Sequence, residues 1–283
     1  MIFRNIFFII LLLFSNIVFS KEIPTIVISA GKTIQSKSIV GSDVSVIDGQ
    51  QINNSEFFIG DIIGYSVPGM SMFQAGGYGT VTGIQMRGLP GRYSTIYIDG
   101  VKMSDPSTPD NRYYGVNQIP SNTVERVEVL KGTNSSLYGS GAISGAINIY
   151  TKKAKEEGVK QSISLVGGMD SWYQPSKERN INYSILGKKN LHDFAINLNG
   201  FFTEGQSAMT DNTENDLYRS ESINAKYGYQ LTDNLRLETD LNYNDSLLEY
   251  DEPTHYSGGF GSDKTSAMKP DNNSTDDYEK TYN

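Results

Sequence analysis

Residues that could do chemistry are few in this chain, and their spacing favours binding over catalysis. The chain has no cysteine and only two histidines, His192 and His255, so it offers little for a zinc site or a Cys/His nucleophile pair. One acidic stretch, residues 210–216, carries three carboxylates, Asp211, Glu214 and Asp216. Their oxygens suit calcium, although the spacing is not that of an EF-hand. A solvated acidic loop explains the same residues, and both interpretations stay open.

A glycine-rich stretch, Gly139 to Gly145, approximates a dinucleotide-binding loop. Its last glycine comes one residue too late, and the sequence after it predicts a strand, whereas a phosphate loop opens a helix. With no nucleophile beside a base and no metal spacing, we expect a protein that is not an enzyme and uses no cofactor, calcium excepted. The net charge of −8 argues against nucleic acid as a partner.

The chain begins with an apolar block behind an early cation. Arg4 precedes the run Ile6 to Phe14, and Ser20 supplies a small residue before Lys21. This pattern predicts a signal peptide over residues 1–20, cut after Ser20. The alternative is a membrane anchor, for which the run is short.

Residues 22–152 mix short β-branched runs, Gly-rich turns and brief helical patterns, which predicts a small α+β domain. A short helix is expected from Ser55 to Ile63, with Ser55 as a candidate N-cap. Strands are expected at Val44–Ile47, Ile84–Arg87, Thr95–Asp99, Arg126–Leu130 and Ala146–Thr151.

From about residue 159 the sequence alternates with period two. In Asn234–Tyr243 the apolar or Thr positions Leu235, Leu237, Thr239, Leu241 and Tyr243 alternate with Arg236, Glu238, Asp240 and Asn242. Four further segments behave similarly: Gln161–Val166, Ile181–Leu186, Asp193–Phe202 and Glu221–Tyr229. Such strands suit a membrane β-barrel, with one face toward hydrocarbon and one toward water. A soluble β-sandwich with one wet face is the alternative.

The connections between these five strands are alternately long and short, as in bacterial outer-membrane barrels. Residues 167–180 and 204–216 are long, whereas 187–192 and 230–233 are short. After Leu248 no final strand is expected, and five strands cannot close a barrel. We therefore expect an incomplete barrel in an N-terminal fragment of a longer polypeptide.

Two sequence blocks carry a family resemblance. Residues 84–106 contain Arg87-Gly88 and a strand ending in Asp99-Gly100-Val101. Residues 124–151 contain Glu-Arg-Val-Glu-Val-Leu-Lys-Gly, Leu-Tyr-Gly and Gly-Ala-Ile-Asn-Ile. In order and spacing these blocks closely resemble the plug domain of TonB-dependent receptors. The resemblance implies a signal peptide (1–20), an N-terminal segment (21–38), an α+β plug (39–153) and the first antiparallel strands of a transmembrane β-barrel (154–283).

The plug of such receptors is held against the inner barrel wall by charged side chains of these blocks. By resemblance this locking role falls to Arg87 and Lys131, with Glu125 and Glu128 beside them. Solvated charges at strand ends are the alternative for each residue. Gly100 and Gly132 end strands where positive φ is expected.

The segment between signal peptide and plug looks like a TonB box. It reads Thr25, Ile26, Val27, Ile28 and Ser29, and polar residues 31–38 give it slack. Such a segment needs only to be extended and free to add to a partner's sheet edge. The alternative is a first plug strand. The resemblance implies the partner, TonB of the inner-membrane energising complex, and a place in the outer membrane among its lipids.

In this family the ligand lies on the outer plug loops. The matching candidates are Phe73, Gln74, Tyr78, Arg92, Tyr93, Tyr113 and Tyr114, which equally suit ordinary loops. Overall spacing is most similar to the cobalamin-receptor branch, where the acidic loop 210–216 coincides with a calcium-binding loop. The resemblance therefore implies energised uptake of a bulky nutrient, with cobalamin favoured. The alternatives are a ferric siderophore or haem receptor, or a non-transporting outer-membrane binding protein.

Overall fold

The structure, a computed structural model, describes residues 26–28, 30–31, 33–53, 57–74, 76–105, 113, 115–170, 176–205, 215–249 and 275–282. The expected signal peptide lies outside these residues. The chain divides into two compact units, Met1–Val40 and Gly41–Asn283. No helix within the described residues has the length and apolar character needed to cross a membrane.

The first unit contains a small antiparallel hairpin. Strand β1 (Ile26–Val27) pairs with β2 (Gln35–Ser36), with Ile26 opposite Ser36 and Val27 opposite Gln35. A single 3₁₀ turn, η1 (Lys37–Ile39), follows β2.

The plug is built on a five-stranded sheet in the order β3-β8-β9-β6-β7. Its strands are β3 (Asp43–Ile47), β6 (Ser94–Ile98), β7 (Val101–Met103), β8 (Val124–Lys131) and β9 (Gly145–Thr151). Neighbours are antiparallel except β6 and β9, which run parallel. Four of the five strands were predicted from sequence. The segment predicted at 84–87 forms β5 (Thr82–Met86), which pairs with β4 (Met70–Gln74) in a separate hairpin.

Short helices and turns cover the plug sheet: α2 (Gly49–Asn53), α3 (Ile59–Ser66), α4 (Ser135–Tyr138), η2 (Gly91–Tyr93), η3 (Gly115–Gln118) and η4 (Ser121–Thr123). The predicted start of α3 was wrong. Phe58 is extended (φ −119°, ψ 148°) and bridges to Pro120, so the helix begins only at Ile59. The buried residues Ile59, Ile62 and Ile63 then pack with Ile147 and Ile149 in the plug core.

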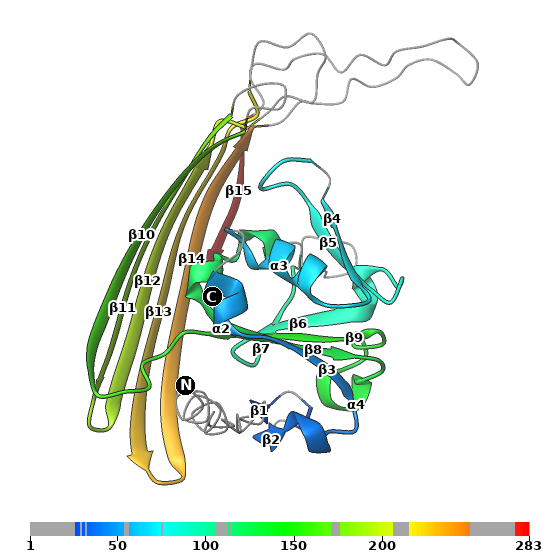
Figure 1. Cartoon of the computed structure of the whole chain (residues 1–283), viewed down its shortest axis with the longest axis vertical. Helices are drawn as coiled ribbons and strands as arrows, with labels where there is room; N and C mark the ends of the chain where they lie inside the picture. Colours follow the sequence, from blue (N-terminus) through cyan, green and yellow to red (C-terminus); the bar gives the residue numbers. More distant parts are fainter. Residues whose placement is uncertain are drawn as a thin grey trace, which may run out of the picture. The chain divides into compact units, whose positions relative to one another are not determined.

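Six long strands form the second sheet, in the order β10-β11-β12-β13-β14-β15, all antiparallel (Figure 1). They are β10 (Gly158–Asp170), β11 (Ser176–Lys189), β12 (His192–Thr203), β13 (Tyr218–Thr232), β14 (Leu235–Glu249) and β15 (Thr275–Tyr282). The sheet is a partial, unclosed barrel with β10 and β15 at its edges. The five predicted strands are confirmed. The sixth, β15, was missed because its sequence, TDDYEKTY, lacks apolar alternation.

The two faces of this sheet reverse the usual distribution of polarity. Side chains on the inner face are polar and buried, among them Ser184, Asn197, Asn199, Asn224 and Lys226. Large apolar side chains point outward and are exposed, among them Ile163, Ile181, Leu198, Leu237 and Leu241. This is the arrangement expected when lipid meets the outer face and a wet lumen or a polar plug meets the inner one.

Candidate functional site

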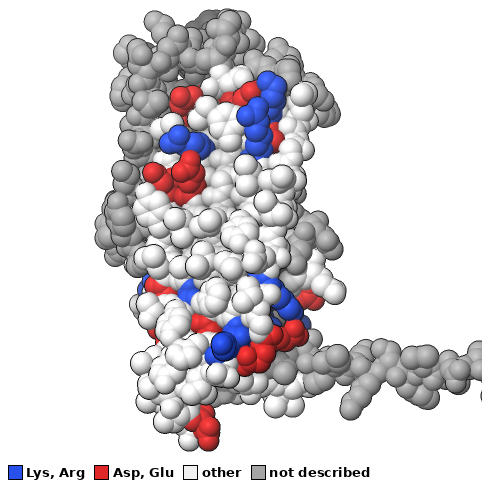
Figure 2. Space-filling model, turned by 90° about the vertical axis from the view of Figure 1, so that its left-hand side faces the viewer, with Lys and Arg blue, Asp and Glu red and all other residues white. Residues whose placement is uncertain are grey.

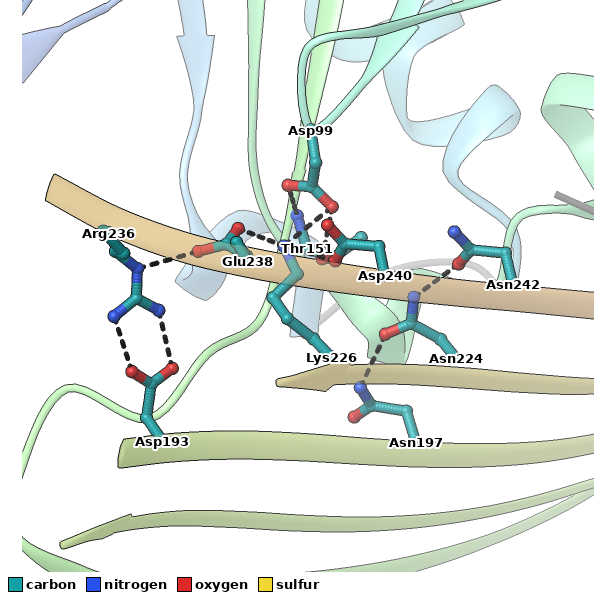
Figure 3. A network of polar contacts seen from close by, with 10 residues as sticks. All are labelled: Asp99, Thr151, Asp193, Asn197, Asn224, Lys226, Arg236, Glu238, Asp240 and Asn242. Atoms are coloured by element: carbon teal, nitrogen blue, oxygen red, sulfur yellow. Dashed lines mark hydrogen bonds and ion pairs between the residues drawn. The ribbon is translucent and has the colours of Figure 1, made fainter. Parts of the chain in front are cut away.

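The inner face of the β12–β14 wall carries a charged row whose centre is Lys226. This side chain, from β13, is only 2% exposed. Its Nζ lies 2.9 Å from Asp99 Oδ2, 3.2 Å from Asp240 Oδ1 and 3.4 Å from Glu238 Oε1 (Figure 3). Burying an ammonium is tolerable only beside opposite charge, and here three carboxylates share it.

Asp99 reaches this cluster from the plug. It occupies the turn between β6 and β7, where its φ of 48° and the φ of 88° at Gly100 give a tight reversal. Its carboxylate also accepts hydrogen bonds from Thr151 N at 3.0 Å and Thr151 Oγ1 at 2.6 Å. The Asp99–Lys226 ion pair therefore links the plug to the barrel wall, and we call it the latch.

A second charged contact braces the wall beside the latch. Arg236 of β14 donates to both Asp193 carboxylate oxygens, at 2.7 and 2.9 Å, and its Nε lies 3.0 Å from Glu238 Oε2. The guanidinium crosses β13 at Gly228, where a Cβ would lie 1.9 Å from Arg236 Nη2. Only glycine leaves room for this bidentate pair.

Farther along the wall the inner face changes from charges to neutral amides. Ser184 Oγ donates to Asn197 Oδ1 at 2.6 Å, and Asn197 Nδ2 donates to Asn224 Oδ1 at 3.1 Å. Asn224 in turn donates to Asn242, so one chain of hydrogen bonds crosses β11 to β14 (Figure 3 shows its three asparagines). We call these four residues the amide ladder.

An aromatic cluster makes a second plug–wall contact. Phe58 of the plug packs edge-on against Phe201 of β12, with ring centroids 5.1 Å apart, and Tyr78 lies 4.9 Å from the same ring. Gly79 (φ 82°) approaches Tyr218 so closely that a Cβ would lie 2.4 Å from its ring. The plug is thus held by an ion pair and by an aromatic contact.

Two tyrosines of the plug, the buried Tyr138 of α4 and the half-buried Tyr150 of β9, have raised pKa values. Burial raises the pKa of Tyr138 to about 12, and Tyr97 OH donates to the Tyr138 carbonyl at 2.9 Å. Burial and then the charge of Glu128 raise the pKa of Tyr150, whose ring lies 4.6 Å from the Arg126 guanidinium. Both phenols stay neutral at physiological pH, so the charge at this site comes from the carboxylates and cations.

The four residues predicted to lock the plug against the barrel wall form ion pairs within the plug or the following linker instead. Arg87 and Lys131 both contact Asp43 of β3, at 2.7 and 3.3 Å. Glu125 pairs with Lys155 at 2.5 Å, and Glu128 pairs with Arg126 on its own strand at 3.1 Å. These pairs lie within the plug or the linker that follows it. A locking role for the four residues stays a prediction.

The predicted ligand residues do not form one group. Phe73 and Arg92 are exposed, Tyr93 is half-buried, and Tyr113 packs on the plug core. Gln74 is held by Gly77 O and Asn117, and Tyr78 belongs to the aromatic cluster, whereas Tyr114 lies outside the described residues.

The remaining predicted sites fall largely outside the described residues. Thr25 and Ser29 lie outside them, while Ile26 and Val27 form β1 and Ile28 follows it. Within this segment Ile26 and Val27 are extended, and β2 pairs with them from within the stretch predicted to be slack. Of the calcium candidates only Asp216 is described, and Asp211 and Glu214 are not. Within the described ranges no three acidic or histidine side chains cluster as a metal site.

The latch was not predicted from the sequence, although signals for it were present. Lys226, Glu238 and Asp240 all lay on the predicted polar faces of two consecutive strands, with opposite charges. Only the register, which sets Lys226 opposite Asp240, brings them together. Asp99 was noted solely as a turn residue.

The chain is similar in sequence to known proteins. A model described as the TonB-dependent Receptor Plug Domain matches residues 36–146. The Vitamin B12 transporter BtuB of Vibrio vulnificus (strain CMCP6) is 29% identical over 231 residues, covering 80% of this chain and 36% of the relative. The Rhizobactin receptor of Rhizobium meliloti (strain 1021) is 29% identical over 248 residues, covering 83% and 32%. The chain thus spans about a third of the length of these relatives.

Solved structures share the fold. The ferric citrate transporter FecA in the unliganded form superposes with a TM-score of 0.61 at 16% identity, covering 74% of this chain and 32% of its own. The siderophore receptor PirA from Acinetobacter baumannii gives 0.59 at 21% identity, covering 72% and 31%.

Proposed function

We propose that the chain is part of a TonB-dependent receptor, and that the intact protein is an outer-membrane transporter for energised uptake of a scarce, bulky nutrient. The observation that most strongly supports this proposal is the latch. The turn between two strands of the plug is joined to the polar inner face of the barrel wall by an ion pair at 2.9 Å. Such a contact can separate without disrupting a hydrophobic core.

A cobalamin-like ligand is the favoured cargo within this proposal. Its support is the similarity to vitamin B12 transporters from Vibrio vulnificus and Photobacterium profundum. A ferric chelate is the second candidate, supported by the similarity to the rhizobactin receptor. Binding of cobalamins and ferric siderophores to the intact receptor, each with and without calcium, separates the candidates. Preference for a ferric chelate would overturn the cobalamin assignment, and calcium-independent binding would remove the role proposed for residues 210–216.

In the proposed orientation the short turns, such as Asn190-Leu191 and Asp233-Asn234, face the periplasm, and the long connections face outward. The extended backbone of β1 supports addition to a partner's sheet edge, in exchange for its pairing with β2.

Deleting Thr25–Ser29 in the intact receptor tests the transport mechanism. We expect ligand binding to survive and uptake to fall to the level of a strain lacking TonB. A deletion of equal length in residues 31–35 is the matched control for linker shortening. Uptake that survives the first deletion would refute energisation through this segment and favour a binding protein that does not transport.

A further inference from the structure

The outer face of the long sheet has an uncharged belt between two charged zones (Figure 2). On β14 the belt runs from Leu235 to Tyr243, with Leu237, Thr239 and Leu241 pointing outward between them. Its length matches the ~9–11 residues with which a tilted strand crosses hydrocarbon. Side chains just beyond the belt, toward the long connections, therefore lie at headgroup level if the proposed function holds.

One cross-strand row at that level combines two arginines and an aromatic ring. Arg179 of β11 is opposite Phe202 of β12, and Phe202 is opposite Arg219 of β13. The Arg179 guanidinium lies 5.8 Å from the Phe202 ring centroid. Both arginines are exposed. Antiparallel neighbours stand about 4.8 Å apart, which places the two arginine backbones roughly 10 Å apart.

These two positive charges have no counter-charge within the described part of the chain. Neither guanidinium lies within ion-pair distance of a carboxylate there, whereas Lys177, one row farther out, pairs with Glu204 at 3.2 Å. An unpaired arginine beside hydrocarbon is costly unless an anion meets it. Arginine's planar donor fork matches phosphate in particular.

The next row of outward-facing side chains, on the belt side of the arginines, restricts where such an anion can lie. Glu221 of β13 is opposite Asp245 of β14, and both belong to the outer face. Their carboxylates repel phosphate from the belt side, so the anion must approach from the side of the long connections. Phe202 between the arginines offers an apolar surface to acyl chains or to a sugar face.

We propose that Arg179, Phe202 and Arg219 form a binding site for an outer-leaflet glycolipid whose headgroup carries two phosphates. Each guanidinium takes one phosphate, and the roughly 10 Å between strands two apart sets the phosphate spacing that is recognised. The inference rests on the proposed function only for the statement that this face lies in the membrane.

The test is native mass spectrometry of the intact receptor in detergent, titrated with diphosphoryl lipid A, monophosphoryl lipid A or dioleoylphosphatidylglycerol. The wild type is expected to bind diphosphoryl lipid A at least fivefold more tightly than either other lipid. Arg179→Gln/Arg219→Gln should abolish that preference. Arg179→Lys/Arg219→Lys, which keeps the charge but loses the donor fork, should retain part of it. Lys188→Gln/Lys189→Gln removes the same charge at the other end of β11 and is the matched control that should retain all of it.

An unchanged preference in the Arg-to-Gln variant would overturn the site, and so would equal binding of all three lipids by the wild type. The Arg-to-Lys variant guards against misfolding, because partial retention requires a folded wall. Lipid binding is read on purified protein and uptake on cells. Failure of the transporter proposal is therefore visible separately, as absent uptake by a receptor that still binds lipid A.

Discussion

The two sides of the latch are predicted to respond unequally to mutation. Lys226→Met removes the cation that Asp99, Glu238 and Asp240 share, and it leaves three carboxylates gathered at a buried point. Removing one partner of a buried ion pair typically costs about 3–5 kcal/mol. Asp99→Asn is milder, since Lys226 keeps two carboxylates and the new amide can still accept from Thr151 N. A lost charged hydrogen bond of this kind costs about 1–3 kcal/mol.

Hydrogen exchange with mass spectrometry on the intact receptor can resolve the difference. Each 1.4 kcal/mol corresponds to about a tenfold change in an opening equilibrium. Asp99→Asn should therefore accelerate exchange on the order of tenfold in peptides covering β6 and β9, and leave β13 unchanged. Lys226→Met should accelerate exchange in the plug and in β13 and β14 together, by a larger factor.

The matched control is Lys102→Met, which removes an exposed plug cation from β7. It should leave both regions at wild-type rates. Asp99 tolerates Asn without backbone strain, because its φ of 48° is a conformation that Asn adopts readily. Wild-type exchange rates in Asp99→Asn would refute the role of the latch, and so would a perturbation of β13 as strong as that of the plug.

Two further substitutions test the remaining contacts. Gly228→Ala places a Cβ 1.9 Å from Arg236 Nη2, so it should lower the urea midpoint of barrel unfolding as much as Arg236→Met does. The double variant should add little, and full additivity would show that Arg236 does not depend on the space at Gly228. Gly79→Ala strains a φ of 82° and pushes on Tyr218, so it should increase proteolysis of the plug loop. Adding Tyr218→Ala should relieve the steric part of that defect, and no relief would argue against the aromatic contact.

The architecture was largely predictable because its signals are local. Period-two alternation identified five of the wall strands, and β-branched runs ending in Gly identified most of the plug sheet. Phe58 shows where local reasoning fails. Its contacts with Pro120 and Phe201 hold it extended and delay the helix, and nothing in residues 55–63 encodes those partners.

The site was less predictable, because ion pairs depend on register and docking. Arg87 and Lys131 carry the expected charge, but their shared partner, Asp43, precedes them by a long sequence separation. In the sequence Lys226 could not be distinguished from the other polar residues of the inner barrel face. Its partner Asp99 belongs to a different domain of the chain. Residue types at these positions were informative, whereas their pairings were not.

The amide ladder is held together by neutral side chains, whereas the latch is an ion pair. Asparagine and serine side chains neither gain nor lose protons across the pH range that bacteria encounter. The chain of hydrogen bonds from Ser184 to Asn242 should therefore persist in acid as it does at neutral pH. The wall beside the plug would then keep its shape through an acid shock.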